Sequence, residues 1–138
     1  MITAYRVWDG QRMYYWDDEE LRLFIDGGKW MLYSARSGEM IFEITNSKNK
    51  NAALMWGTGF SCKEKETFRE DIVKYGIKQQ IGVICYDRNQ AKYKVVPLEM
   101  YHANAGGGGW TGFTLSRSTP IEVIGNVYKN PELLEVSE

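Results

Sequence analysis

The amino-acid sequence predicts a mainly β fold, in which N-terminal strands pack on a small SH3-like β-barrel and a short helix ends the chain. Three apolar runs separated by polar turns follow one another over residues 71–97. Five Trp, nine Tyr and five Phe add aromatic residues, which favour strands. A chain of 138 residues with 43% hydrophobic side chains is expected to form one domain, residues 1–138, comprising an N-terminal strand region (1–45), a barrel region (54–128) and a short helix or tail (129–138).

The first 45 residues predict five short strands. The runs are aromatic or aliphatic and alternate in part with polar residues; they cover residues 4–8, 12–16, 21–25, 29–33 and 40–44. Asp9-Gly10, Asp26-Gly27-Gly28 and Ser37-Gly38 separate these runs, and such residues accept turn conformations. Residues 46–51, reading NSKNKN, are polar and predict a connection between two halves of the same domain.

The barrel region begins after this connection. Thr67, followed by Glu70, matches a capping box and predicts one helical turn before the next strand. Strands are then predicted at residues 72–75, 81–86 and 93–96, with a hairpin turn at residues 87–90 and Pro97 as the end of the last run.

The C-terminal part predicts a loop, two strands and a helix. Residues 105–109, reading AGGGG, lose much backbone entropy on ordering and predict a mobile surface loop. Strands are predicted within residues 110–115 and 121–128, with a turn at 116–120. Asn130 as N-cap and Pro131 in the first helical position predict the terminal helix.

The cysteine content and the N-terminus limit the class of protein. Cys62 and Cys85 form neither a CxxC motif nor a disulfide framework, so no zinc site and no cofactor are predicted. The chain starts without a basic segment followed by an apolar block, and no apolar run approaches the roughly 18 residues of a membrane span. We therefore expect a cytoplasmic protein that does not insert into a membrane.

Three blocks of the sequence resemble the YopX family of bacteriophage and prophage proteins. They are residues 5–9 with 13–15; residues 58–60, 70–75 and 81–83; and residues 122–128 with 130–134. Glu70 stands where the family has Gly, and residues 62–67 replace its turn-rich stretch. The resemblance implies a β-rich fold with a barrel, a bacterial host cell, unknown function and a tendency to homo-oligomerise. It transfers no catalytic residue.

The sequence predicts no catalytic site. His102 is the sole histidine and has no recognisable nucleophile near it in the sequence. Gly57-Thr58-Gly59 matches no phosphate-binding motif, and a tight turn between strands is its simpler interpretation. We therefore predict that the protein is not an enzyme, and a hydrolase ranks third among the functions considered.

A basic middle region supports one hypothesis of function. Residues 46–96 hold ten Lys or Arg against five Asp or Glu, although the chain has a net charge of −1. Small barrels bind single strands through basic grooves and stacking rings. The candidate nucleic-acid contacts are Lys74, Lys78, Arg88, Lys92, Lys94, Tyr86 and Tyr93. The alternative is that these lysines protect strand edges and the tyrosines pack against the sheet.

The N-terminal aromatic residues support the favoured hypothesis. Large rings and methionine are enriched at interface cores. The candidate interface consists of Trp8, Met13, Tyr14, Tyr15 and Trp16, and the same residues could instead form the protein's own core. We predict a phage or prophage accessory protein that acts by binding a phage or host protein and by homo-oligomerising, with a nucleic-acid-binding module as the alternative.

Overall fold

The computed structural model describes residues 4–36, 39–103 and 109–135. The chain divides into two compact units, Met1–Trp56 and Gly57–Glu138. The predicted organisation as one domain, and the packing of N-terminal strands on the barrel, remain predictions.

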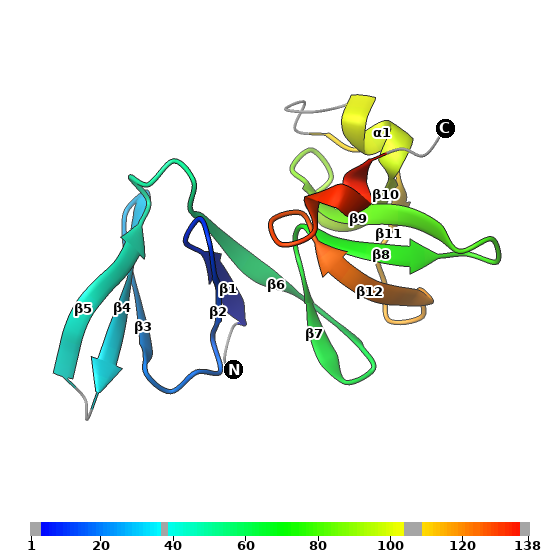
Figure 1. Ribbon diagram of the computed structural model, residues 1–138. Coiled ribbons are helices and arrows are strands. Elements are labelled where there is room, and N and C mark those ends of the chain that lie inside the picture. Colours follow the sequence, from blue (N-terminus) through cyan, green and yellow to red (C-terminus); the bar gives the residue numbers. More distant parts are fainter. Residues whose placement is uncertain (1–3, 37–38, 104–108, 136–138) are drawn as a thin grey trace. The chain divides into compact units, whose positions relative to one another are not determined.

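The first unit contains two antiparallel sheets (Figure 1). In one sheet β1 (Tyr5–Trp8) lies between β2 (Met13–Tyr15) and the first residues of β6 (Ala53–Cys62). In the other sheet β4 (Lys29–Arg36) lies between β3 (Leu21–Asp26) and β5 (Glu39–Asn46). The five strands predicted in residues 1–45 are confirmed, although several bounds shift by one to three residues.

The core of the first unit follows from strand alternation. Val7 and Leu32 are fully buried, and Leu21 joins them in one cluster. Leu23 pairs with Leu32 across β3 and β4, so both lie on the same face of their sheet. Partly buried side chains complete this core, namely Tyr5, Tyr14, Leu23, Trp30, Ile44 and Leu54.

The second unit is built on a curled antiparallel sheet of five strands (Figure 1). Its strand order is β11 (Phe113–Thr114), β10 (Lys92–Pro97), β9 (Gln80–Asp87), β8 (Asp71–Tyr75) and β12 (Ile121–Asn126). The later residues of β6 pair separately with β7 (Lys65–Phe68). Two short helices follow β10 and β12, namely α1 (Leu98–Ala103) and the 3-10 helix η1 (Pro131–Leu134). The predicted mainly β class with a short C-terminal helix is confirmed.

This sheet is buried on both faces. Ile72, Val83, Cys85 and Val96 form a cluster on one face, which side chains of α1, β12 and η1 help to cover. Val73, Ile84, Val95 and Leu115 form a cluster on the other. Because neighbouring residues of β8, β9 and β10 belong to different clusters, the apolar runs read as nearly continuous in the sequence.

The predicted capping box at Thr67 is wrong. Thr67 lies in β7, where its hydroxyl donates to the Phe60 carbonyl over 2.6 Å and is 2.5 Å from the Thr58 hydroxyl. Glu70 instead makes a turn with a φ of 75° and donates its N–H to the Ile84 carbonyl. Gly is the residue that most readily adopts a positive φ, but here Glu70 adopts this conformation in the place of a Gly.

The C-terminal predictions are confirmed only in part. Helix α1 was not predicted, and of residues 110–115 only Phe113–Thr114 form a strand. Helix η1 starts at Pro131 with Asn130 in the N-cap position, as predicted, but the Asn130 side chain makes no capping hydrogen bond. Its oxygen accepts the Asn126 N–H over 3.2 Å instead. Most of the predicted glycine loop, residues 105–108, lies outside the described residues.

Candidate functional site

The predicted basic residues lie at two ends of the second unit's sheet. Lys78 lies in the turn between β8 and β9, and Arg88 in the turn between β9 and β10. The eight residues of β9 separate these turns, a length of roughly 25 Å at about 3.3 Å per residue. Lys92 begins β10 near Arg88, while Lys74 pairs with Glu122 across β8 and β12. The cations therefore do not gather in one groove.

The lysines and tyrosines lie on opposite faces of this sheet. Tyr93 packs with the cluster that contains Val95, and its ring is 5.0 Å from that of its cross-strand partner Tyr86. Lys92 and Lys94 flank Tyr93 in β10 and so point to the other face. Alternation along a strand therefore separates the predicted cations from the predicted stacking rings.

Lys94 is a buried structural residue. Its ammonium lies 2.8 Å from a carboxylate oxygen of Asp87 and donates to the Trp110 carbonyl over 2.8 Å. The Trp110 N–H donates to the same carboxylate over 3.1 Å, so Asp87 and Lys94 hold both backbone groups of Trp110. The Lys94 side chain is 7% exposed, which makes it unsuitable as a nucleic-acid contact.

The carboxylate of Asp87 is held ionised by this arrangement. The hydrogen bond from Lys94, followed by that from the Trp110 N–H, lowers the pKa of Asp87 to about 2. Its other oxygen accepts the N–H groups of Asn89 and Gln90, which fixes the turn between β9 and β10. This cluster positions Trp110, whose ring stacks on Tyr101 at 5.5 Å.

The predicted aromatic interface of the first unit is divided between two faces. Tyr14 pairs with Val7 and joins the core. Trp8 and Met13 pair with each other one position further along, which places them on the opposite face of their sheet. Trp8, Met13 and Trp16 are half-buried, and Tyr15 is 38% exposed. Their role in an interface remains a prediction.

The outer face of the β3–β4–β5 sheet carries apolar side chains that include the exposed Phe24. Cross-strand pairing places Phe24 with Met31, and Tyr33 with Glu43, on the face opposite Leu23 and Leu32. The Phe24 and Tyr33 rings meet edge to face at 5.6 Å, and Phe24 is 43% exposed. We refer to Phe24, Met31 and Tyr33, with the charged residues beside them, as the outer face.

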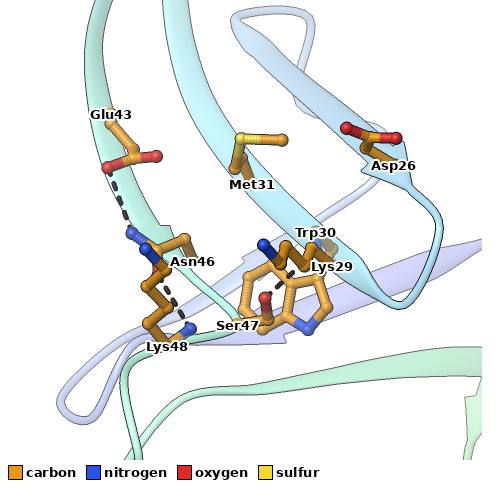
Figure 2. Close-up of a pocket in the computed structure, with 8 residues that line it drawn as sticks. All are labelled: Asp26, Lys29, Trp30, Met31, Glu43, Asn46, Ser47 and Lys48. Atoms are coloured by element: carbon orange, nitrogen blue, oxygen red, sulfur yellow. Dashed lines mark hydrogen bonds between the residues drawn. The ribbon is translucent and has the colours of Figure 1, made fainter.

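A shallow pocket of about 380 Å³ lies at one end of the outer face. Figure 2 shows Met31 between Glu43 of β5 and Asp26 of β3. The full lining is Asp26, Lys29, Trp30, Met31, Glu43, Asn46, Ser47 and Lys48. Hydrogen bonds from Asn46 to Glu43 and from the Trp30 N–H to the Ser47 hydroxyl hold its rim. The rim carries two carboxylates and two ammonium groups.

This surface was not predicted from the sequence. Its signals were present in the alternation of residues 21–26 and in the Gly27-Gly28 turn, which together define a regular β3–β4 hairpin. From the sequence alone, these residues predict only a strand and a turn.

The residues considered for catalysis are dispersed. His102 is exposed, with its Nε2 atom 2.6 Å from the Leu134 carbonyl. Gly57, Thr58 and Gly59 lie inside β6, so the predicted tight turn is wrong. Burial raises the pKa of the Cys85 thiol, and the Cys62 thiol donates to the Ile121 carbonyl. Among the described residues, no three His, Cys, Asp or Glu side chains come together as metal ligands.

No helix within the described ranges has the length and apolar character needed to cross a bilayer.

Comparisons with known proteins agree over nearly the whole chain. The family model described as YopX protein matches residues 4–135. The chain is 38% identical over 149 aligned positions to the SPbeta prophage-derived uncharacterized protein YopX of Bacillus subtilis strain 168, covering 98% of both chains. It is also similar to the crystal structure of protein yopX from Bacillus subtilis, with a TM-score of 0.69, 36% identity, and coverage of 98% of this chain and 100% of that one.

Proposed function

The chain belongs to the YopX family, and from that premise we propose that it is a phage or prophage accessory protein that acts by binding proteins, including a second copy of itself. It acts without catalysis, in the cytoplasm of a bacterial host. The relative from Bacillus subtilis is prophage-derived, which supports the origin.

The proposed self-association is inferred from the outer face. Burying an apolar side chain such as that of Phe24 gives a favourable free energy, yet Phe24 is 43% exposed. The pocket at one end of the same face carries Asp26 and Glu43 together with Lys29 and Lys48 on its rim. Two copies related by a two-fold axis bring the same patch together, and a patch with both signs of charge complements itself. A second copy therefore fits this face.

Nucleic-acid binding ranks below protein binding. Single-strand binding needs a basic groove with stacking rings in the same place. Here Lys92 and Tyr93 point to opposite faces, Lys78 and Arg88 lie at opposite ends of β9, and Lys94 is buried.

The test is light scattering coupled to size exclusion, with the absorbance ratio read across the peak at low and raised salt. We expect an oligomer free of nucleic acid, and we expect Phe24→Ser to lower the molar mass. Phe113→Ser is the matched control, because Phe113 is 38% exposed but lies on β11 of the second unit.

A wild-type protein that stays monomeric at the highest concentration loaded would refute self-association. A mass that falls equally in both variants would remove the outer face from the proposal. Nucleic acid that elutes with the protein and dissociates at raised salt would favour the alternative function.

A further inference from the structure

β3 and β5 are the two edge strands of the β3–β4–β5 sheet (Figure 1), and their pairing with β4 differs in regularity. β5 pairs with β4 through two register shifts, between Leu32 and Tyr33 and between Ser34 and Ala35. β3 pairs with β4 through six consecutive residue pairs without a shift. Bulges are one of the means by which proteins prevent an edge from accepting another strand. The edge at β5 is protected in this way, and the edge at β3 is not.

The hairpin geometry shows which backbone groups of β3 point outward. β3 and β4 are joined by the two-residue loop Gly27-Gly28, in which Gly27 has a φ of 62°, and the loop is closed by the Asp26–Lys29 pair. The closing pair of such a loop exchanges hydrogen bonds, and bonded and non-bonded pairs then alternate. Phe24 and Asp26 therefore bond to β4. Leu21, Leu23 and Ile25 direct their N–H and C=O groups away from it.

The hydrogen bonds of Leu21 agree with this assignment. Its N–H donates to the Asp18 carbonyl over 3.2 Å, and its carbonyl accepts from the Arg22 guanidinium over 2.8 Å. Neither partner belongs to β4. Within the described part of the chain, the outward N–H and C=O groups of Leu23 and Ile25 have no hydrogen-bond partner. They form a short open edge whose spacing matches another extended strand.

The side chains and charges around this edge indicate the chemistry of its partner. Ile25 is 55% exposed and Phe24 is 43% exposed, on opposite faces of β3. Over residues 17–26 the chain carries five carboxylates and one guanidinium. The four acidic residues 17–20 immediately before β3 are all exposed. A strand with apolar residues and a positive charge complements this edge.

We propose that β3 binds an extended, basic and apolar segment of a partner protein, which adds to the sheet as a fourth strand. This inference rests on the proposed protein-binding function and names the surface and the class of partner. Main-chain hydrogen bonds to Leu23 and Ile25 supply affinity, and the Ile25 side chain and the acidic residues supply selectivity. A second copy does not fit here, because antiparallel pairing of two β3 strands places the Glu20 end of one beside Asp26 of the other.

The experiment measures fluorescence anisotropy of a labelled nonapeptide of alternating lysine and valine. The same peptide with glutamate in place of lysine is the charge control. We expect the lysine peptide to bind more tightly, and we expect the paired change Glu19→Lys and Glu20→Lys to reverse that preference. When the lysine peptide is added to the wild-type protein, the amide chemical shifts of Leu23 and Ile25 should change most.

Ile25→Pro and Ile25→Thr form a matched pair. Both remove apolar surface, but only proline also removes the outward N–H, and a proline whose missing N–H faces outward is tolerated in an edge strand. We expect Ile25→Pro to weaken peptide binding about tenfold or more, and Ile25→Thr to weaken it much less. Circular dichroism checks that both variants fold, and the amide shifts test the wild type independently of either variant.

Equal affinity of Ile25→Pro and wild type would overturn the proposal. It would equally be overturned if the lysine peptide failed to bind, or bound no more tightly than the glutamate peptide. If the peptide fails while light scattering shows an oligomer that depends on Phe24, this inference falls and the proposed self-association stands. If the lysine peptide binds and the wild-type protein is monomeric, the proposed self-association falls and this inference stands.

Discussion

Replacing Gly82 by alanine should destabilise the second unit through a single methyl group. Gly82 lies in β9, opposite Val73 on one side and Pro97 on the other. An alanine Cβ at this position would lie 2.9 Å from the Val96 carbonyl oxygen, 3.0 Å from Tyr75 Cε1 and 3.1 Å from Val95 Cγ1. The first distance is shorter than real Cβ contacts, the other two are tighter than most of them, and Val95 and Val96 are fully buried.

The expected loss is about 1–2 kcal/mol in the free energy of unfolding. Inserting a methyl group into a packed core costs about 1–3 kcal/mol. Alanine recovers about 0.4–1 kcal/mol by restricting the unfolded chain. The steric cost is larger, so the sign is destabilising. Urea denaturation followed by circular dichroism measures the difference.

Gly28→Ala is the control for this prediction. No atom lies within 4 Å of the position that its Cβ would take, and its φ is not in the left-handed region. Alanine there should leave stability unchanged or raise it by up to about 1 kcal/mol. If Gly82→Ala were as stable as the wild type, the close approach of the Val96 carbonyl to β9 would be wrong.

Two further predictions concern ionisable groups of the second unit. The folded pKa of Asp87 is about 2, below its ordinary value of 3.8, so this carboxylate stabilises the fold above pH 4 and loses that contribution as the pH falls from about 4 to 2. Lys94→Met should lower stability at pH 7 and flatten the pH dependence in that range; urea midpoints at pH 7, 4, 3 and 2 would show it, and unchanged curves would contradict it. Cys62 is half-buried, whereas Cys85 is buried and has a raised pKa, so a thiol reagent at pH 8 should label one cysteine in the native protein and both in urea. Equal labelling of both in the native protein would contradict the burial of Cys85.

Local patterns predicted the elements that depend on local chemistry. The five N-terminal strands and the Asp26-Gly27-Gly28 turn follow from alternation and from glycine's access to positive φ. The turn after Asp87 likewise follows from a short side chain that binds nearby N–H groups. In each case, the determining contacts lie within a few residues of one another.

Features that depend on distant contacts were missed. Lys94 was interpreted as a surface cation, but it is buried because Asp87 and the Trp110 carbonyl bind its ammonium, and Trp110 lies 16 residues further along the chain. Helix α1 follows Pro97 and is partly buried through Leu98 and Tyr101, which pack on the core of β8, β9 and β10. Thr67 and Glu70 matched a capping box, although pairing with β6 placed Thr67 in a strand.

The candidate site shows the limit of reasoning from residue type. Lysines interleaved with tyrosines suggested a single binding surface, yet adjacent residues in a strand point to opposite faces, so that same pattern divides the two kinds of side chain. A surface must instead be sought among residues two apart in one strand and their cross-strand partners. Phe24, Met31 and Tyr33 meet this condition on the outer face, and Leu23 and Ile25 meet it along the edge of β3.

The two surfaces differ in charge. Around the pocket, balanced signs suit a second copy, whereas the acidic surroundings of β3 repel a second copy and attract a basic partner. One sheet can therefore serve self-association and partner binding through separate groups, which is why Phe24→Ser and Ile25→Pro should affect different measurements.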